Sequence, residues 1–121
     1  MVVVKGIRGA VVARDNTSQA IRQAVGELLG TITEKNSFSK QDVAALILTA
    51  TPDLTADFPA RAAREMGWDA VPLLSAAEVN VDGALPRVIR ALVLINCPEE
   101  FQVKHVYLGE AAKLRPDLSE A

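Results

Sequence analysis

The segment VIRALVLINC, residues 88–97, places the strongest constraint on how this chain can fold. Alternation along a strand separates its residues into two faces: Val88, Arg90, Leu92 and Leu94, and then Ile89, Ala91, Val93 and Ile95. Both faces are apolar, and a strand of this kind is covered on both sides. Arg90 is therefore expected to project into an interior, a cleft or a subunit interface. Its guanidinium needs an anionic or polar partner there, because it does not lose its proton.

The remaining segments predict a mixed β-sheet with helices on one side, an α/β or α+β layer fold. The expected strands are 2–13, 43–51, 70–76 and 85–97, with a further strand beginning at 104. Apolar residues at helical spacing after the helix-start residues 15–19 predict an amphipathic helix of about four to five turns. A short helix over 58–66 begins near Pro59 and ends before Gly67, and Pro116 keeps the tail 115–121 non-helical. With 121 residues, we expect one domain spanning 1–121.

Composition excludes several classes of function. The net charge of -2 predicts no nucleic-acid partner, and no apolar run is long enough to predict a membrane span. A signal peptide is not recognisable, so a cytoplasmic protein is expected. One Cys and one His cannot build a metal cluster, and no phosphate-binding glycine motif or nucleophile motif occurs, so no metal and no cofactor are expected. A structural or exposed role is favoured for His105, and an inert thiol for Cys97.

Arginines are the candidate functional residues in this sequence. Arg8 lies on a strand face with Val4, Gly6, Ala10 and Val12, so its situation resembles that of Arg90. Both could form structural salt bridges, for example to Glu78 or Asp53. Both could instead bind an anionic ligand, and two such arginines on separate strands favour a binding site.

Further polar residues could belong to the same site. On the short helix, Arg61 has Asp57 and Glu65 one turn away on either side, whereas Arg64 has no acidic residue nearby. A solvated surface position also accounts for Arg64. Glu78 and Tyr107 lie beside apolar strands and could be satisfied core residues or part of the site.

Several motifs together resemble the AroH-class monofunctional chorismate mutases: GIRGA (6–10), TPDLTADFPARAARE (51–65), VPLLSAAE (71–78), RVIR (87–90), HVYL (105–108) and LRPDL (114–118). They occur in order over almost the whole chain, and the ordered set is highly specific. The resemblance implies an isomerase that rearranges chorismate to prephenate, on the route to phenylalanine and tyrosine. It implies no cofactor and no covalent intermediate, in agreement with the missing motifs.

The resemblance also implies the roles of individual residues. Arg90 is the cation at the ether oxygen, which gains negative charge as the ether bond breaks. Arg8 and Tyr107 hold a substrate carboxylate, and Glu78 accepts from the ring hydroxyl; Arg90, Glu78 and Arg8 form the catalytic set. The other implied substrate contacts have lesser roles. Arg64 lies at the entrance of the site, Phe58 and Leu74 form its walls, and Arg115 belongs to the tail that covers it. Ser75 and Arg61 are implied contacts at which this sequence differs from many family members.

At Ser75 and Arg61 this sequence differs modestly from the pattern of the family. Ser75 stands where related sequences often carry Cys, and it is expected to contact the ring-hydroxyl region without being essential. Arg61 stands where Lys is also found, and it keeps the charge with a different geometry.

The family forms homotrimers with active sites between subunits, so the chain is expected to do the same, with three copies packed around a barrel-like core. Two alternatives stay open at this point. One is a trimeric enzyme of the reactive enamine/imine deaminase type, and the other is a non-catalytic metabolite-binding trimer.

Overall fold

A computed structural model describes residues 1–118. Its five strands form one mixed sheet with the order β3-β2-β4-β1-β5. The strands are β1 (Val2–Val12), β2 (Val43–Ala50), β3 (Leu73–Ala77), β4 (Val88–Pro98) and β5 (Val106–Tyr107). β4 pairs antiparallel with both β1 and β2, and the two outer pairs, β2 with β3 and β1 with β5, are parallel. The predicted mixed sheet is confirmed.

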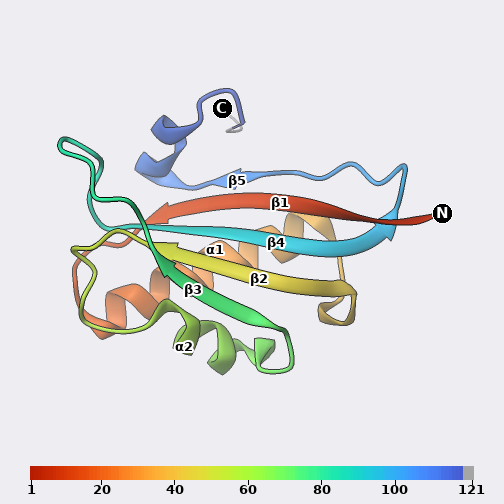
Figure 1. The fold of residues 1–121 in the computed structure, drawn as a ribbon, viewed down its shortest axis with the longest axis horizontal. Helices are drawn as coiled ribbons and strands as arrows, with labels where there is room; N and C mark the ends of the chain where they lie inside the picture. The colour runs from red at the N-terminus through yellow and green to blue at the C-terminus, as the bar shows by residue number, and fades with distance from the viewer. Residues whose placement is uncertain (119–121) are drawn as a thin grey trace.

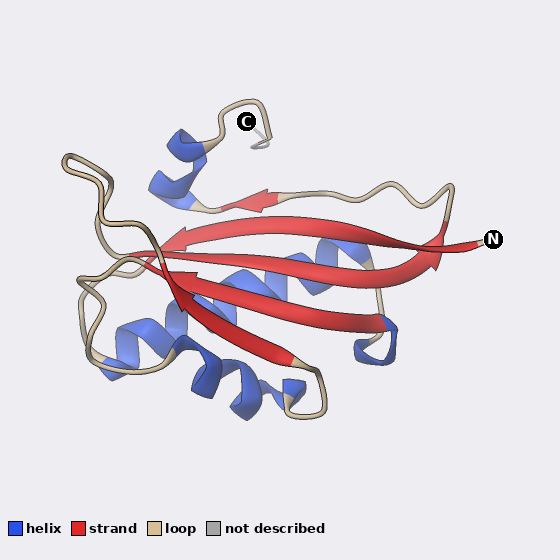
Figure 2. Ribbon diagram, viewed as in Figure 1, coloured by secondary structure: helices blue, strands red, loops and turns tan. Residues whose placement is uncertain are grey.

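Both α-helices lie on one face of the sheet (Figures 1 and 2). The long helix α1 (Ser18–Asn36) begins where Thr17 accepts a hydrogen bond from the backbone N–H of Ala20 at 3.1 Å, as helix-start residues do. The shorter α2 (Pro59–Ala63) continues into a widened turn, Arg64–Trp68, and Gly67 ends it at φ 94°. Two 3₁₀ segments, Lys40–Asp42 and Gly109–Leu114, complete the structure. None of the described helices is long and apolar enough to cross a membrane.

The core lies between the sheet and α1. Alternate residues of the central strands are buried toward the helices, among them Ile7, Leu46, Leu48, Ile89, Val93 and Ile95. The apolar stripe of α1 packs against them, with Ile21, Val25, Leu28, Leu29 and Ile32 fully buried. The residues that were expected at helical and strand spacing therefore form the core.

The second face of the sheet is open within one chain, and here the expectation of two covered faces is wrong for the single chain. Val4 is 57% exposed and Arg8 is exposed. Leu92 and Leu94 of β4 are only half-buried, and the Arg90 side chain is 41% exposed to solvent. Both α-helices lie on the first face, so within residues 1–118 apolar side chains of the second face stay partly exposed.

Several boundaries differ from the sequence expectation; β3, for example, starts at Leu73 rather than 70. β4 starts at Val88 rather than 85, where Arg87 has left-handed backbone (φ 57°) after Pro86. β5 contains only two residues, although the sequence from 104 onward reads as strand. The cause is a side chain from α1 that binds the backbone of Lys104, described below.

Candidate active site

Four of the residues implied by the resemblance line one cleft of about 390 Å³ on the open face of the sheet. They are Arg8 from β1, Arg90 from β4, Tyr107 from β5 and Arg115 from the C-terminal segment; Ile47, Thr49 and Leu92 form part of its floor. Three arginines in one small cleft create a site with positive potential, which suits a ligand with more than one negative charge.

Strand register explains why these residues meet. Arg8 lies opposite Leu92 in the antiparallel β1–β4 pair, so Arg90 is its diagonal neighbour on the same face. Diagonal neighbours in such a pair are roughly 7–8 Å apart. On the other side of β1, Ala10 lies opposite Tyr107 in the parallel β1–β5 pair. The long-range pairing of three strands thus collects cations that are far apart in sequence.

Arg90 forms an ion pair with Glu78. Its Nε lies 2.8 Å from Glu78 Oε1, and the hydroxyl of Thr49 donates to the same oxygen at 2.7 Å. Glu78 follows β3 directly, and its side chain reaches across β2 to β4. The salt bridge that the sequence left open is therefore made to Glu78, while Asp53 accepts from the backbone N–H of Arg87 at 2.8 Å.

This ion pair is compatible with a binding role as well as with a structural one. The Glu78 side chain is 16% exposed and the Arg90 side chain 41%. Within residues 1–118, the guanidinium of Arg90 makes its ion pair through Nε alone. Its terminal nitrogens are left for another acceptor in the cleft.

A second group of candidate residues lies at the other edge of the sheet, around α2 and β3. Phe58, Arg64, Leu74 and Ser75 line a cleft of about 310 Å³. Phe58, Arg61 and Ser75 also line a neighbouring cleft of about 560 Å³. Phe58 and Leu74 are both exposed, which is unusual for large apolar side chains and marks this edge as a surface for contact.

The charges around α2 are arranged differently from the expectation. Arg61 pairs with Asp57 at 3.6 Å, as predicted. Glu65, however, pairs with Arg22 of α1 at 2.8 Å, and the expected partnership with Arg61 is wrong because an arginine from another helix takes the carboxylate. Arg64 makes no ion pair with any residue that the structure describes, which leaves its charge for a ligand or a neighbouring chain.

Asp57 is held by several donors. The hydroxyl of Ser18 donates to Asp57, and this bond is the largest cause that lowers the pKa of its carboxyl below 3.8. The backbone N–H of Phe58, at 2.7 Å, and the positive charges of Arg61 and Arg22 act in the same direction. The carboxylate therefore fixes the start of α2 and the position of Phe58.

Arg8 and Tyr107 of the first group cannot reach the second group within one chain. β1 is three strand spacings from β3 in the sheet order, which is about 14 Å. Arg8 and Tyr107 therefore lie well away from Leu74 and Ser75. Glu78, which follows β3, bridges toward the first group through its ion pair with Arg90.

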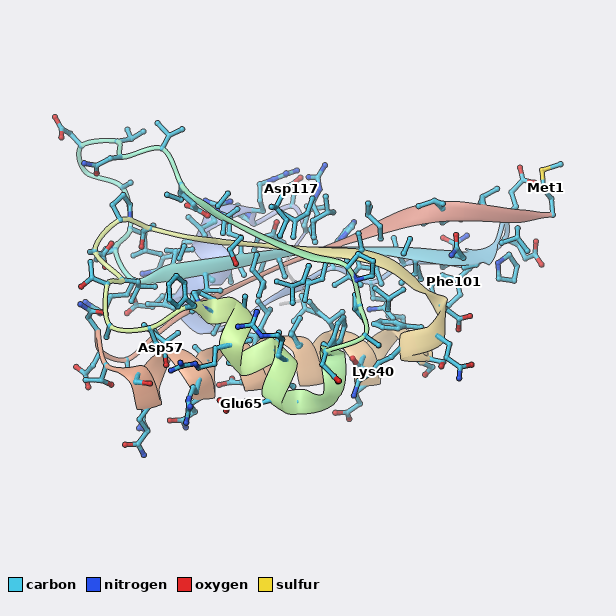
Figure 3. The ribbon with its side chains drawn as sticks, turned by 60° about the horizontal axis from the view of Figure 1, so that its bottom comes forward. Met1, Lys40, Asp57, Glu65, Phe101 and Asp117 are labelled. Atoms are coloured by element: carbon cyan, nitrogen blue, oxygen red, sulfur yellow. The ribbon has the colours of Figure 1, made fainter. Side chains whose placement is uncertain are left out.

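The C-terminal segment lies beside the first group. The guanidinium of Arg115 forms a two-point contact with Asp117, at 2.8 and 3.1 Å, which raises the pKa of Arg115 and lowers that of Asp117. Figure 3 shows Asp117 on the opposite side of the sheet from Asp57 and Glu65, away from the helices. The expected tail, 115–121, is thus placed up to residue 118, and residues 119–121 lie outside the described part of the chain.

One contact of the site was missed by the sequence interpretation. The backbone N–H of Arg8 donates to Nδ1 of His105 at 2.9 Å. Burial lowers the pKa of His105 below 6.5, and the positive charges of Arg8 and Arg115 lower it further. A lone histidine two residues before Tyr107 was the only sequence signal available for this contact.

Comparison with known proteins gives concordant matches. The family description chorismate mutase type I matches residues 4–118. The chain is 53% identical to the chorismate mutase AroH of Thermus thermophilus, covering 98% of this chain and 99% of that protein. It is 42% identical to the chorismate mutase AroH of Bacillus subtilis, covering 97% and 94%. A solved chorismate mutase from Clostridium thermocellum superposes with a TM-score of 0.86 at 39% identity, covering 90% of this chain and 98% of the other.

Proposed function

The chain belongs to the type I, AroH-class chorismate mutase family, and from this premise we propose how its residues perform the reaction. The reaction is the rearrangement of chorismate to prephenate in the biosynthesis of phenylalanine and tyrosine. The deaminase and non-catalytic alternatives receive no support from the comparisons.

We propose that Arg90 stabilises the breaking ether bond. In the rearrangement a carbon–oxygen bond breaks while a carbon–carbon bond forms within the same molecule, and the ether oxygen gains negative charge. A fixed cation at that oxygen favours the transition state over the ground state, which is the requirement for catalysis. The ion pair from Nε to Glu78 at 2.8 Å is the observation that supports this role best, because it anchors the guanidinium of a residue that lines the cleft and does not use its terminal nitrogens.

Glu78 has two roles in this proposal. Its Oε1 holds Arg90 and is itself held by Thr49, so its position is well defined. Its remaining acceptor capacity binds the ring hydroxyl, and its charge faces the ring, where positive character develops. Because the arginines of the site outnumber its one carboxylate, the site stays positively charged and binds a dianionic substrate.

Arg8 and Tyr107 hold a substrate carboxylate, with Arg115 beside them in the same cleft. Clamping the carboxylates restrains a flexible substrate in its compact, reactive conformer. Restraint of this kind supplies a substantial part of the barrier reduction in many enzymes. Phe58, Arg61, Arg64, Leu74 and Ser75 complete the site from the other sheet edge, as walls and entrance.

The functional form that we propose is a homotrimer whose sites lie between subunits. Two observations support it. The open face of the sheet carries exposed apolar residues such as Val4, and Arg8 and Tyr107 of the first group lie on strands at the far side of the sheet from the second group near β3. Cyclic packing would cover that face and bring the first group of one subunit to the second group of its neighbour. A single domain over 1–121 and a cytoplasmic location complete the proposal.

The test is an assay with purified protein and chorismate. Loss of chorismate absorbance with prephenate as product is the expected result, together with a trimeric mass in sedimentation equilibrium. A monomer that turns chorismate over at full rate would contradict the interfacial site. Binding of chorismate without turnover would contradict the catalytic roles.

A further inference from the structure

We infer that His105 is a positioning residue for the reaction: its neutral ring holds the backbone of Arg8 and thereby sets Arg8 against Tyr107. The buried amide of Asn36 creates the need for this contact. The inference rests on the proposed carboxylate-binding role of Arg8 and Tyr107.

The arrangement starts at the C-terminal residue of α1. Asn36 is 3% exposed, and its side chain binds both backbone polar groups of Lys104. Its Nδ2 donates to the carbonyl of Lys104 at 2.9 Å, and its Oδ1 accepts from the N–H of Lys104 at 2.8 Å. The same Nδ2 donates to the carbonyl of Ile32 at 2.9 Å. One side chain thus removes Lys104 from the edge of the sheet.

The position of Lys104 affects the hydrogen bonds of β1. In a parallel pair the next carbonyl of the edge strand would normally accept from the N–H of Arg8, but β5 begins only at Val106. His105 Nδ1 takes that place at 2.9 Å. A ring nitrogen that accepts carries no proton, so the ring must be the neutral tautomer with its proton on Nε2.

The hydrogen bond between Arg8 and His105 supports the pairing of the two strands that carry Arg8 and Tyr107. The β1–β5 pair has only two registered residue pairs, Gly9 with Val106 and Ala10 with Tyr107. The N–H of Leu108 also donates to the carbonyl of Ala10 at 3.0 Å. The His105 bond is made to Arg8 itself, so it links the strand that carries the arginine to the short strand that carries the tyrosine.

Protonation would remove this link. An imidazolium has no acceptor nitrogen, and it would meet two cations, Arg8 from β1 and Arg115 from the C-terminal segment. Among the described residues, no carboxylate is one of the groups that shift the pKa of His105, and the carboxylate of Asp117 is paired with Arg115. The lowered pKa of His105 is consistent with a ring that stays neutral around pH 7.

The first measurement is spectroscopic and does not depend on turnover. The chain has a single His, so its imidazole resonances are assigned without ambiguity. Nitrogen chemical shifts are expected to show an unprotonated Nδ1 and a protonated Nε2, with a pKa below 6.5. A ring protonated at Nδ1 at pH 7, or a pKa above 6.5, would overturn the inference.

The second measurement uses a matched pair of variants. His105→Asn keeps an acceptor close to the position of Nδ1 without a titrating group, whereas His105→Leu keeps bulk without an acceptor. For His105→Leu we expect KM to rise by about 3- to 10-fold, the value of one lost hydrogen bond, with kcat nearly unchanged. For His105→Asn we expect KM near the wild-type value.

The pH profile separates positioning from general destabilisation. In the wild type, kcat/KM is expected to fall as pH drops through the pKa of His105, and His105→Asn is expected to lack that phase. A His105→Leu protein with wild-type KM, or a His105→Asn protein with the wild-type acid phase, would refute the inference. An Arg8→Ala variant with unchanged KM would instead refute the proposed role of Arg8, and the resonances of His105 would still report on the bond itself.

Discussion

Arg90 and Glu78 form an ion pair of 2.8 Å across an intervening strand, from β4 to the residue that follows β3. The Arg90 side chain is 41% exposed, so part of its guanidinium surface stays free although its Nε is paired with Glu78. We therefore interpret the pair as a means of orienting the guanidinium. The predictions below start from that relationship.

Replacing Arg90 is expected to affect kcat above all. For Arg90→Ala we expect kcat to fall by at least roughly 10²- to 10³-fold, because a preorganised donor at the developing charge is lost. Arg90→Lys should recover only part of the rate, since an ammonium cannot bind Glu78 and the ether oxygen with the geometry of a guanidinium. Steady-state kinetics with sedimentation as the control for assembly checks this, and a near-normal kcat for Arg90→Ala would remove Arg90 from the mechanism.

Glu78→Gln tests the charge of Glu78 separately from its hydrogen bonds. The amide oxygen can still accept from Arg90, so the variant removes the negative charge that faces the ring. We expect kcat to fall by roughly 10²-fold by analogy with other electrostatic groups. Thr49→Val is the matched control, because it removes the 2.7 Å hydrogen bond to Glu78 and keeps the charge. It should cost less than about 10-fold, and equal losses in both variants would contradict a role for the charge.

Tyr107→Phe is expected to act mainly on KM. The phenolic hydroxyl binds a carboxylate in the proposal, and that interaction is present in the ground state and the transition state alike. Loss of one such hydrogen bond should raise KM by about 2- to 10-fold. Initial-rate measurements over a range of chorismate concentrations decide the point. A large kcat defect with unchanged KM would show that the hydroxyl acts on the reacting atoms instead.

Subunit complementation tests whether the two groups of site residues come from different chains. Arg8→Ala damages the first group and Arg64→Ala the second, so each variant alone is expected to be impaired. In mixed trimers from co-expression, about a quarter of the interfaces would pair two intact groups and regain wild-type turnover. If one chain supplied the whole site, mixing would yield only the average of the two variants.

Gly9 is expected to be intolerant of a side chain. A Cβ there would lie 2.8 Å from Cδ1 of Ile32, 2.9 Å from Cδ1 of Leu28 and 3.1 Å from the carbonyl oxygen of Val106. Overpacking of this kind costs about 1–3 kcal/mol, so Gly9→Ala should lower the free energy of unfolding. The experiment is chemical denaturation at one fixed protein concentration.

Gly30 supplies the control for that experiment. It lies within α1 with no atom within 4 Å of an added Cβ. Gly30→Ala should therefore raise stability by about 0.5–1 kcal/mol, since Ala is the better helix former. Equal destabilisation of both variants would show that the close approach at Gly9 is not responsible.

Several features of the fold were predictable because they depend on local pattern. Helical spacing of apolar residues predicted α1, and alternation predicted that Arg90 shares a face with Leu92 and Leu94. The ordered motifs identified the family and hence the candidate residues.

Other features were decided by contacts between distant segments. Glu65 binds Arg22 rather than Arg61, because α1 presents an arginine that the spacing within α2 cannot reveal. β5 is two residues long because Asn36 binds Lys104, and for the same reason His105 becomes part of the site.

The sequence by itself determined where the main strands and the two α-helices lie, which side chains share a face, and which reaction the chain performs by family. Only the tertiary structure decided that Glu78 meets Arg90 across β2, that Arg8 and Tyr107 line one cleft, and that the remaining site residues lie near β3, at the edge of the sheet far from β1 and β5. The physical reason is that propensity and periodicity act over a few residues, whereas partners across a sheet are set by strand order and register. Those depend on how the whole chain packs its apolar faces.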